Sequence, residues 1–420
     1  MAIYRREFLK ASAALVAAAA AQQGRLAYAG QDVKQGADNV LQGGVDAGDV
    51  PGVVAMATTA GGTIYEGGFG KRRLDEDTAM STDTVFMIAS MTKALTGTAA
   101  MQLVEQGKLN LDTPAAKIYP ALNDTKVLTG WTTDGKPVLR PPKRPITLRH
   151  LLTHTAGFAY ELWNTDIQQY QKVMELPGIG SCKNDALKMP LMFDPGDRWE
   201  YGINIDFAGK MVETVSGKRL GDYLHDNLFA PLGMDTTAFK ISPEMRSRLA
   251  KVHQRSATDG TLAPIDFEMP QEPEFEMGGG GIYSTTGDYL KFVRMMLNKG
   301  KGNGNQVLKP ETVALMSKNA MGNTKVTLLK TAIPNLTNDA EFFPGMRKNW
   351  GLSFMINEQQ APTGRSAGSL AWAGLANTYY WIDQRKDVAG VYMTQILPFA
   401  DDKALPLFYA FEKSVYQSMG

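Results

Sequence analysis

The chain has 420 residues, of which 44% are apolar and 21% are charged, and this composition is typical of a folded protein with two or three lobes. Its 44 Lys and Arg residues balance 43 Asp and Glu residues, so charge gives no basis for binding nucleic acid or another polyanion. A single cysteine, Cys182, excludes an intrachain disulfide and a four-cysteine zinc site. No apolar run reaches the ~20 residues that a transmembrane helix needs.

Residues 1–29 have the three parts of an export signal in the right order. The pair Arg5-Arg6 is followed by an apolar stretch from Ala11 to Ala21, and Ala27-Tyr28-Ala29 supplies an A-x-A cleavage site. The arginine pair resembles the twin-arginine class of signals. The alternative is an alanine-rich helix that packs on the body of the protein. We expect a periplasmic or secreted bacterial protein, in which a lone thiol has no partner in its own chain.

Strands are predicted near both ends of the chain, and helices between them. Apolar, β-branched and aromatic runs predict strands over residues 52–59, 63–70, 369–381 and 388–395. Apolar residues three and four apart predict helices from Ser90 to a stop at Gly107, from Thr147 to a stop at Gly157, through Ala208 and Val215 to a stop at Gly217, and from Ala404 to Met419. Residues 120–145 are polar and predict a loop, and residues 194–197 predict a turn.

This order predicts an α+β fold in which both ends of the chain build one antiparallel sheet flanked by helices. We assign residues 30–118 and 285–420 to the sheet domain. Residues 119–284 then form an inserted, mostly helical domain.

The first candidate for chemistry is Ser90-Met91-Thr92-Lys93. On a helix that begins at Ser90, Lys93 lies one turn later on the same face, so the hydroxyl and the amine can meet. A serine becomes a nucleophile beside a base, and a lysine serves as that base when burial lowers its pKa. The alternative is an N-terminal capping serine and a surface lysine. The apolar residues on both sides favour a buried lysine, and a cation is unusual at the positive end of a helix.

The second candidate, Gly364-Arg365-Ser366-Ala367-Gly368, matches the G-x-S-x-G motif of α/β-hydrolases. That motif needs a strand before it, a helix after it and a catalytic histidine further along the chain. No histidine follows Ser366, so we reject it as the nucleophile.

The third candidate is the pair His150 and His154, four residues apart on a predicted helix. This spacing can bind zinc, but the glutamate of H-E-x-x-H is missing and no third ligand is evident. We therefore interpret both histidines as structural, and we expect no metal.

Several motifs together resemble the serine β-lactamase and penicillin-binding superfamily. Within it, the chain is similar to class C β-lactamases and most similar to family VIII carboxylesterases, over roughly residues 45–415. The resemblance is carried by Ile88-Ala89-Ser90-Met91-Thr92-Lys93, the run from Thr147 to Gly157, Trp199-Glu200-Tyr201-Gly202-Ile203, Pro231-Leu232-Gly233-Met234, Gly279-Gly280-Gly281-Ile282 and Trp372-Ala373-Gly374.

The resemblance implies a β-lactamase-like fold and two-step acyl transfer without a cofactor. Ser90 would be the nucleophile, and Lys93 and Tyr201 would share the proton transfers. Tyr201 acts as a base only if positive charge favours its phenolate, and we expect Lys93 to supply that charge. The backbone N–H groups of Ser90 and Leu375 would hold the oxyanion.

Two departures from the β-lactamase pattern point to esters. The Y-x-N motif has Ile203 in place of its asparagine, and the K-T-G motif is replaced by Trp372, Ala373 and Gly374. We expect these four residues to contact the substrate, and a tryptophan there to favour an uncharged apolar group over the carboxylate of a β-lactam.

The leading hypothesis is an exported serine carboxylesterase that acts on a small-molecule ester. The alternatives are a β-lactamase or D-alanyl peptidase, and a catalytically silent binding protein of the same fold. The physiological ester and the oligomeric state stay open.

Overall fold

The computed structural model describes residues 33–419. The predicted export signal over residues 1–29 lies outside the described residues. No helix within residues 33–419 is long and apolar enough to cross a bilayer.

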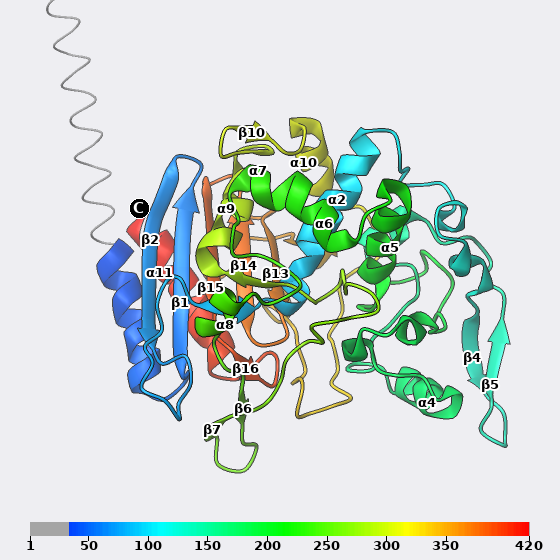
Figure 1. Cartoon of the computed structure of the whole chain (residues 1–420), viewed down its shortest axis with the longest axis horizontal. Helices are drawn as coiled ribbons and strands as arrows, with labels where there is room; N and C mark the ends of the chain where they lie inside the picture. Colours follow the sequence, from blue (N-terminus) through cyan, green and yellow to red (C-terminus); the bar gives the residue numbers. More distant parts are fainter. Residues whose placement is uncertain (1–32, 420) are drawn as a thin grey trace, which may run out of the picture.

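A seven-stranded antiparallel sheet forms one side of the molecule (Figure 1), in the order β11-β12-β13-β14-β15-β1-β2. The strands are β1 (Gly52–Thr59), β2 (Gly62–Gly70), β11 (Lys348–Trp350), β12 (Met355–Asn357), β13 (Leu370–Gly374), β14 (Thr378–Asp383) and β15 (Val388–Met393). The two ends of the chain meet where β1 pairs with β15, with Val54 opposite Met393 and Thr58 opposite Ala389. The predicted α+β fold, with one sheet built from both ends of the chain, is confirmed.

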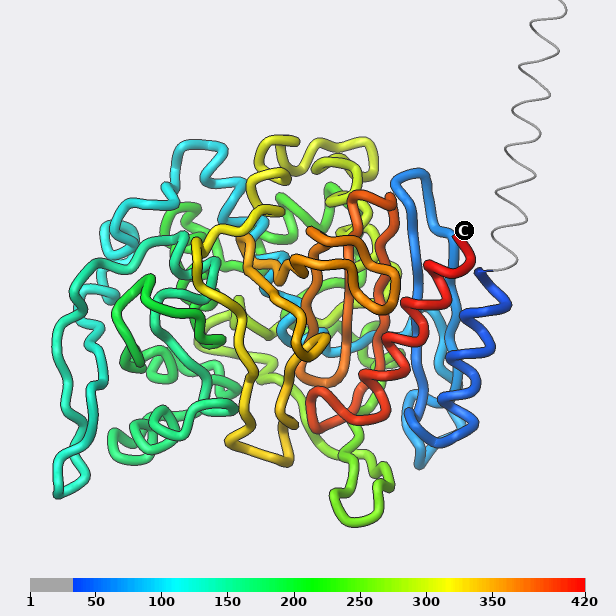
Figure 2. The backbone as a smooth tube through the Cα atoms, turned by 180° about the vertical axis from the view of Figure 1, so that it is seen from behind, coloured from blue at the N-terminus to red at the C-terminus, as the bar shows by residue number. Residues whose placement is uncertain are grey.

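Helices cover both faces of the sheet. On one face, a helix over residues 33–46 lies beside α11 (Ala404–Ser418), as Figure 2 shows at the two ends of the colour scale. On the other face, α9 (Thr286–Leu297) contacts β1 and β15. Helix α2 (Thr92–Glu105) is buried along nearly its whole length. A helix that is apolar on all sides belongs to the interior, so α2 is the central helix of the fold.

The chain between α2 and α9 forms short helices, short strands and long connections. Its helices are α3 (Leu148–Leu152), α4 (Thr165–Met174), α5 (Asn204–Ser216), α6 (Leu220–Leu224), α7 (Ala230–Leu232) and α8 (Pro243–Ser247), and α10 (Pro310–Met316) follows α9. The short strands outside the seven-stranded sheet are β3 (Val85–Met87), which precedes α2, and β4 (Val127–Trp131), β5 (Pro137–Arg140), β6 (His253–Arg255), β7 (Leu262–Pro264), β8 (Tyr283–Thr285), β9 (Lys301–Gly302), β10 (Asn305–Gln306) and β16 (Ile396–Leu397).

Three local predictions are wrong. Residues 120–145 are not only a loop, because β4 and β5 form a hairpin there, with Gly135 at a positive φ of 78° in its turn. The run 369–381 is two strands, β13 and β14, separated by a turn in which Asn377 has a φ of 60°. The α-helix begins at Thr92, and Ser90 lies in the 3-10 turn before it.

Candidate active site

Ser90 lies in a tightly held turn between β3 and α2. Strand β3 pairs with β8, and the Ile88 N–H donates to the Ile282 carbonyl at 3.0 Å. Ala89 adopts a φ of 42°, a left-handed conformation that costs a non-glycine residue about 1 kcal/mol or more. Ser90 itself is partly exposed, whereas the residues on both sides of it are buried. The turn therefore presents one hydroxyl at the surface of the core.

Lys93 lies directly beneath that hydroxyl and is fully buried. Its Nζ is 3.0 Å from Ser90 Oγ, 3.1 Å from Tyr160 Oη and 2.6 Å from the Gly279 carbonyl oxygen. A neutral amine has two N–H donors and one lone pair, so two of these contacts can take its hydrogens while the lone pair faces Ser90. Burial lowers the pKa of Lys93 to about 7, although Asp206 opposes this shift. The amine is therefore available as a base near neutral pH.

Tyr201 completes the group from the opposite side. Its Oη accepts a hydrogen bond from the Trp372 indole N–H at 2.9 Å, and its ring lies 4.6 Å from Lys93 Nζ. Burial raises the pKa of Tyr201 above its usual value of 10, and hydrogen bonds with Ser90 and Trp372 only partly oppose this. The expectation that Lys93 makes Tyr201 a phenolate is therefore wrong. Tyr201 is a neutral phenol that can donate its proton.

Two further residues of the site were not predicted from the sequence. Tyr160 accepts a hydrogen bond from Lys93 and is itself buried. Asp206, in the first turn of α5, is fully buried and accepts the Gly279 N–H at 2.8 Å through Oδ1. Its Oδ2 has no hydrogen-bond partner within residues 33–419. Burial raises the pKa of Asp206 to about 6, and Lys93 opposes the shift, so the two groups share a buried charge.

Gly279 leaves no room for a side chain between these groups. A Cβ atom there would lie 2.6 Å from Asp206 Oδ2 and 2.8 Å from Tyr160 Oη. Its N–H binds Asp206 and its carbonyl binds Lys93. The glycine-rich run after Glu276 therefore serves close backbone packing beside the site.

Leu375 lies in the turn between β13 and β14, next to Ser90. The Leu375 N–H donates to no acceptor within the described residues, and the side chains of Leu375 and Ser90 line the same cavity. Gly374 contacts the Ser90 turn so closely that a Cβ there would lie 2.2 Å from the Ile88 oxygen. The turn thus brings a free backbone donor to the nucleophile.

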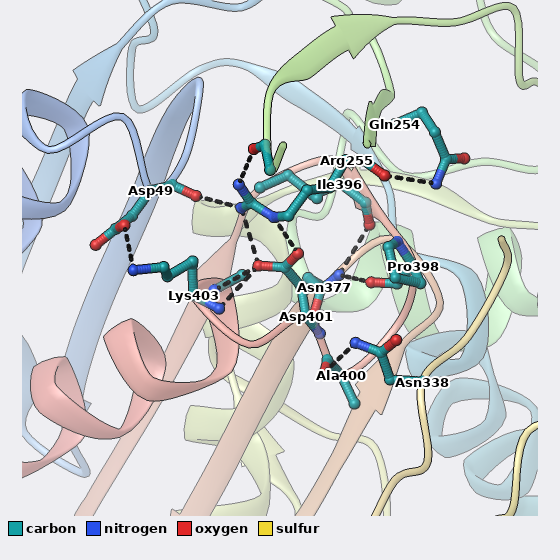
Figure 3. A network of polar contacts seen from close by, with 12 residues as sticks. Asp49, Gln254, Arg255, Asn338, Asn377, Ile396, Pro398, Ala400, Asp401 and Lys403 are labelled. Atoms are coloured by element: carbon teal, nitrogen blue, oxygen red, sulfur yellow. Dashed lines mark hydrogen bonds and ion pairs between the residues drawn. The ribbon is translucent and has the colours of Figure 1, made fainter. Parts of the chain in front are cut away.

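A polar network holds this turn from behind (Figure 3). Asn377 donates from Nδ2 to the carbonyls of Ile396 and Pro398, each at 2.8 Å, and its Oδ1 accepts the Asp401 N–H at 3.1 Å. Asp401 in turn forms an ion pair with Arg255 on β6. Since Asn377 is two residues after Leu375, the network fixes the backbone of the turn that carries the free N–H.

A cavity of about 320 Å³ opens over Ser90. It is lined mainly by apolar and aromatic side chains, among them Leu162, Trp163, Phe267 and Leu375. Trp372, Ala373, Gly374 and Ile203 are buried and are not among the lining residues. Trp372 instead contacts Tyr201, while Ile203 precedes the first turn of α5. Their predicted contact with substrate stays a prediction.

The two rejected candidates have structural surroundings. Ser366 lies in the loop between β12 and β13, and its N–H donates to Asp383 at 2.8 Å. His150 Nδ1 accepts the Thr147 N–H within the cap of α3. His154 lies beyond the end of α3 with a φ of 55°, and its Nδ1 is 3.0 Å from Asn204 Nδ2. The two histidines therefore do not share a helix face. No cluster of three metal-ligating side chains occurs within residues 33–419.

Comparison with known proteins agrees with this geometry. The family model described as Beta-lactamase matches residues 37–412. The chain belongs to this family. The resemblance to the serine β-lactamase and penicillin-binding superfamily is thereby confirmed.

Similar proteins include acyltransferases and esterases from fungi. The chain is 31% identical to the ML-236A carboxylate methylbutanoyltransferase of Penicillium citrinum, over 88% of this chain and 91% of that protein. It is 30% identical to a lovastatin esterase of Penicillium rubens, over 90% and 98% respectively. Among solved structures, a mutant of the simvastatin synthase of Aspergillus terreus superposes with a TM-score of 0.80 at 30% identity, over 91% of this chain and 96% of the other.

Proposed function

We propose that this β-lactamase family protein is a serine hydrolase that cleaves carboxylic esters through an acyl-enzyme on Ser90. The observation that carries the proposal is the contact between the partly exposed Ser90 hydroxyl and the fully buried Lys93 amine at 3.0 Å, at the floor of an apolar cavity. A buried amine with a lowered pKa beside a serine is an arrangement that activates the serine as a nucleophile.

In the first step, Lys93 Nζ takes the proton from Ser90 as Oγ attacks the ester carbonyl carbon. The N–H groups of Ser90 and Leu375 stabilise the oxyanion, and donors of this kind lower the barrier by about 3–4 kcal/mol each. The C–O bond to the alcohol then breaks, and Tyr201 gives its phenolic proton to the leaving oxygen. Lys93 returns the serine proton to Tyr201, so that both groups regain their starting states.

In the second step, water attacks the acyl carbon and Ser90 leaves. Lys93 and Tyr201 carry the water proton back to Ser90 Oγ by the same path in reverse. Asp206 supports both steps, because its carboxylate lies in the same buried region and favours the protonated form of Lys93.

Esters are favoured over β-lactams because the cavity provides no cation for a substrate carboxylate. The residue at the first position of the third motif is Trp372, and no Lys, Arg or His lines the cavity over Ser90. A class C β-lactamase or D-alanyl peptidase is the alternative activity. Comparing kcat/KM for p-nitrophenyl acetate with kcat/KM for an anionic cephalosporin separates the two, and a preference for the cephalosporin would reject the esterase.

Acyl transfer to an alcohol is a second candidate activity. Relatives named methylbutanoyltransferases match 88% of this chain and 87% of it. An acyl group on Ser90 is open to attack by an alcohol as well as by water. Adding an alcohol during ester turnover and measuring the new ester against the free acid gives the partition between the two.

The decisive experiment is intact-mass spectrometry of the protein after brief exposure to p-nitrophenyl acetate. We expect one added acetyl group, located on Ser90 by peptide mapping, and none in Ser90→Ala. Labelling by a fluorophosphonate should follow the same pattern. No adduct and no turnover would favour a catalytically silent binding protein.

We also propose that the protein is exported to the periplasm or secreted. The support is the Arg5-Arg6 pair, the apolar stretch and the A-x-A site within residues 1–29. Expression of the full chain in a bacterial host should give a mature protein in the periplasmic fraction that starts at Gly30. Replacing both arginines with lysine should leave it unprocessed in the cytoplasm.

A further inference from the structure

The cavity over Ser90 carries an unbalanced negative charge. Its lining contains one charged side chain, Glu161, and no Lys, Arg or His. Glu161 is half-buried and follows Tyr160 directly in the chain. A single carboxylate among apolar side chains indicates a binding role, since a charged group is disfavoured in such surroundings unless a partner compensates it.

The chain itself does not neutralise this carboxylate. Glu161 Oε1 accepts the Ile179 N–H at 3.0 Å, and a Cβ on Gly178 would lie 2.9 Å from the same oxygen. No Lys, Arg or His within residues 33–419 forms an ion pair with Glu161, and no described residue donates a hydrogen bond to Oε2. The backbone of residues 178–179, which also lines the cavity, therefore holds one carboxylate oxygen and leaves the other without a partner among the described residues.

Aromatic side chains surround the same space. Tyr160, Trp163 and Phe267 all line the cavity, and the rings of Tyr160 and Trp163 meet edge to face with centroids 6.1 Å apart. The faces of such rings attract cations, and quaternary ammonium groups are typical ligands of aromatic sites. Lys93 lies beneath Ser90, with its Nζ 5.1 Å from the centroid of the Tyr160 ring, and it directs its hydrogens to Tyr160 and Gly279.

From this juxtaposition we infer that the natural substrate is an ester that carries an ammonium group, bound against Glu161 and the aromatic wall while its carbonyl lies at Ser90. The inference rests on the proposed esterase function and names the class of ester that this cavity selects. It also separates this chain from relatives whose names specify a carboxylate or an acid as substrate.

The test uses two esters of equal shape and different charge. 2-(Trimethylammonio)ethyl acetate and 3,3-dimethylbutyl acetate differ in a nitrogen for a carbon. We expect wild-type kcat/KM at pH 8 and low ionic strength to be at least tenfold higher for the cationic ester, which corresponds to about 1.4 kcal/mol. The ratio should fall toward one as salt is raised, because salt screens a partly exposed charge.

Glu161→Gln should bring the ratio of the two esters close to one. Glu66→Gln is the matched control, because Glu66 is an exposed carboxylate on β2 outside the cavity, and its ratio should equal that of wild type. A wild-type ratio of one or less, or a ratio that survives Glu161→Gln, overturns the inference.

A binding measurement on wild type keeps the test independent of the variant. Tetramethylammonium should inhibit hydrolysis of p-nitrophenyl acetate competitively, at a concentration at least tenfold lower than its neutral counterpart tert-butanol. Equal inhibition by the two would overturn the inference as well. Failure of the proposed function has a different signature, since neither ester would be cleaved and no acyl group would appear on Ser90.

Discussion

Replacing Trp372 with Phe isolates the hydrogen bond that its indole N–H donates to Tyr201 at 2.9 Å. In the proposed mechanism Tyr201 gives up its proton as the alcohol leaves, so its oxygen becomes negative in the transition state. A hydrogen bond to a charged group contributes about 1.5–3 kcal/mol, which corresponds to a loss of about tenfold to a hundredfold in kcat. The assay is steady-state hydrolysis of p-nitrophenyl acetate, with pre-steady-state bursts to separate acylation from deacylation.

Trp350 provides the matched control for this variant. Its ring is fully buried and lies 4.6 Å from that of Trp372, but its indole N–H has no hydrogen-bond partner within residues 33–419. Trp350→Phe therefore removes the same volume from the same aromatic cluster without removing a hydrogen bond. Its stability loss should match that of Trp372→Phe, while its kcat should stay within about threefold of wild type, since packing alone changes.

The comparison of the two variants tests the reasoning directly. Equal losses of kcat would mean that packing around Tyr201 matters and the hydrogen bond does not. Unchanged activity in Trp372→Phe would mean that Tyr201 carries no charge in the transition state. Thermal unfolding of both variants checks that each remains folded at the assay temperature.

Three other changes have separate outcomes. Ser90→Ala should abolish ester hydrolysis in a folded protein, whereas Ser366→Ala should keep nearly full activity. The reverse result would identify Ser366 as the nucleophile in place of Ser90. Wild-type kcat/KM should rise with pH through an inflection near 7, because only neutral Lys93 accepts a proton. Asp206→Asn should shift this inflection to lower pH and reduce kcat/KM at high pH, since Asp206 raises the Lys93 pKa. A shift to higher pH would contradict the assignment of Lys93 as the base. Asn377→Ala should lower kcat more than it raises KM, because Asn377 fixes the turn with the oxyanion donor, and an effect on KM alone would argue against this.

Local sequence signals were sufficient where partners are close in the chain. Ser90 and Lys93 are three residues apart, so even a 3-10 turn in place of the expected α-helical start brings their side chains together. The N- and C-terminal strands were also predictable, since their β-branched and aromatic residues are dense enough to exclude a helix. The turn inside residues 369–381 was missed, because Leu375, Ala376 and Asn377 carry no strong turn signal apart from the asparagine.

Sequence alone could not find Asp206 or Tyr160. An acidic residue in the first turn of a helix is ordinarily explained by the helix dipole, and nothing local distinguishes Asp206 from a surface residue of that kind. Its role depends on Gly279, which is 73 residues away in the chain. The sequence around Tyr160 indicates only a buried aromatic residue, which Tyr160 is. The contact between its hydroxyl and Lys93 is visible only in the fold. The division of the chain into a sheet domain and an inserted domain over residues 119–284 stays a prediction.

The buried pair of Lys93 and Asp206 explains how a fully buried lysine can still accept a proton. Burial lowers the pKa of Lys93 and so weakens the binding of a proton to the amine. The Asp206 carboxylate opposes this shift and leaves the pKa at about 7. Above that pH Lys93 is neutral and can accept a proton. When it takes the proton of Ser90, the carboxylate of Asp206 stabilises the ammonium that forms. Because the charge formed on Lys93 is compensated inside the core, the proton transfer creates no uncompensated buried cation. The pair thus couples the working pH of the site to a carboxylate that never needs to contact the substrate.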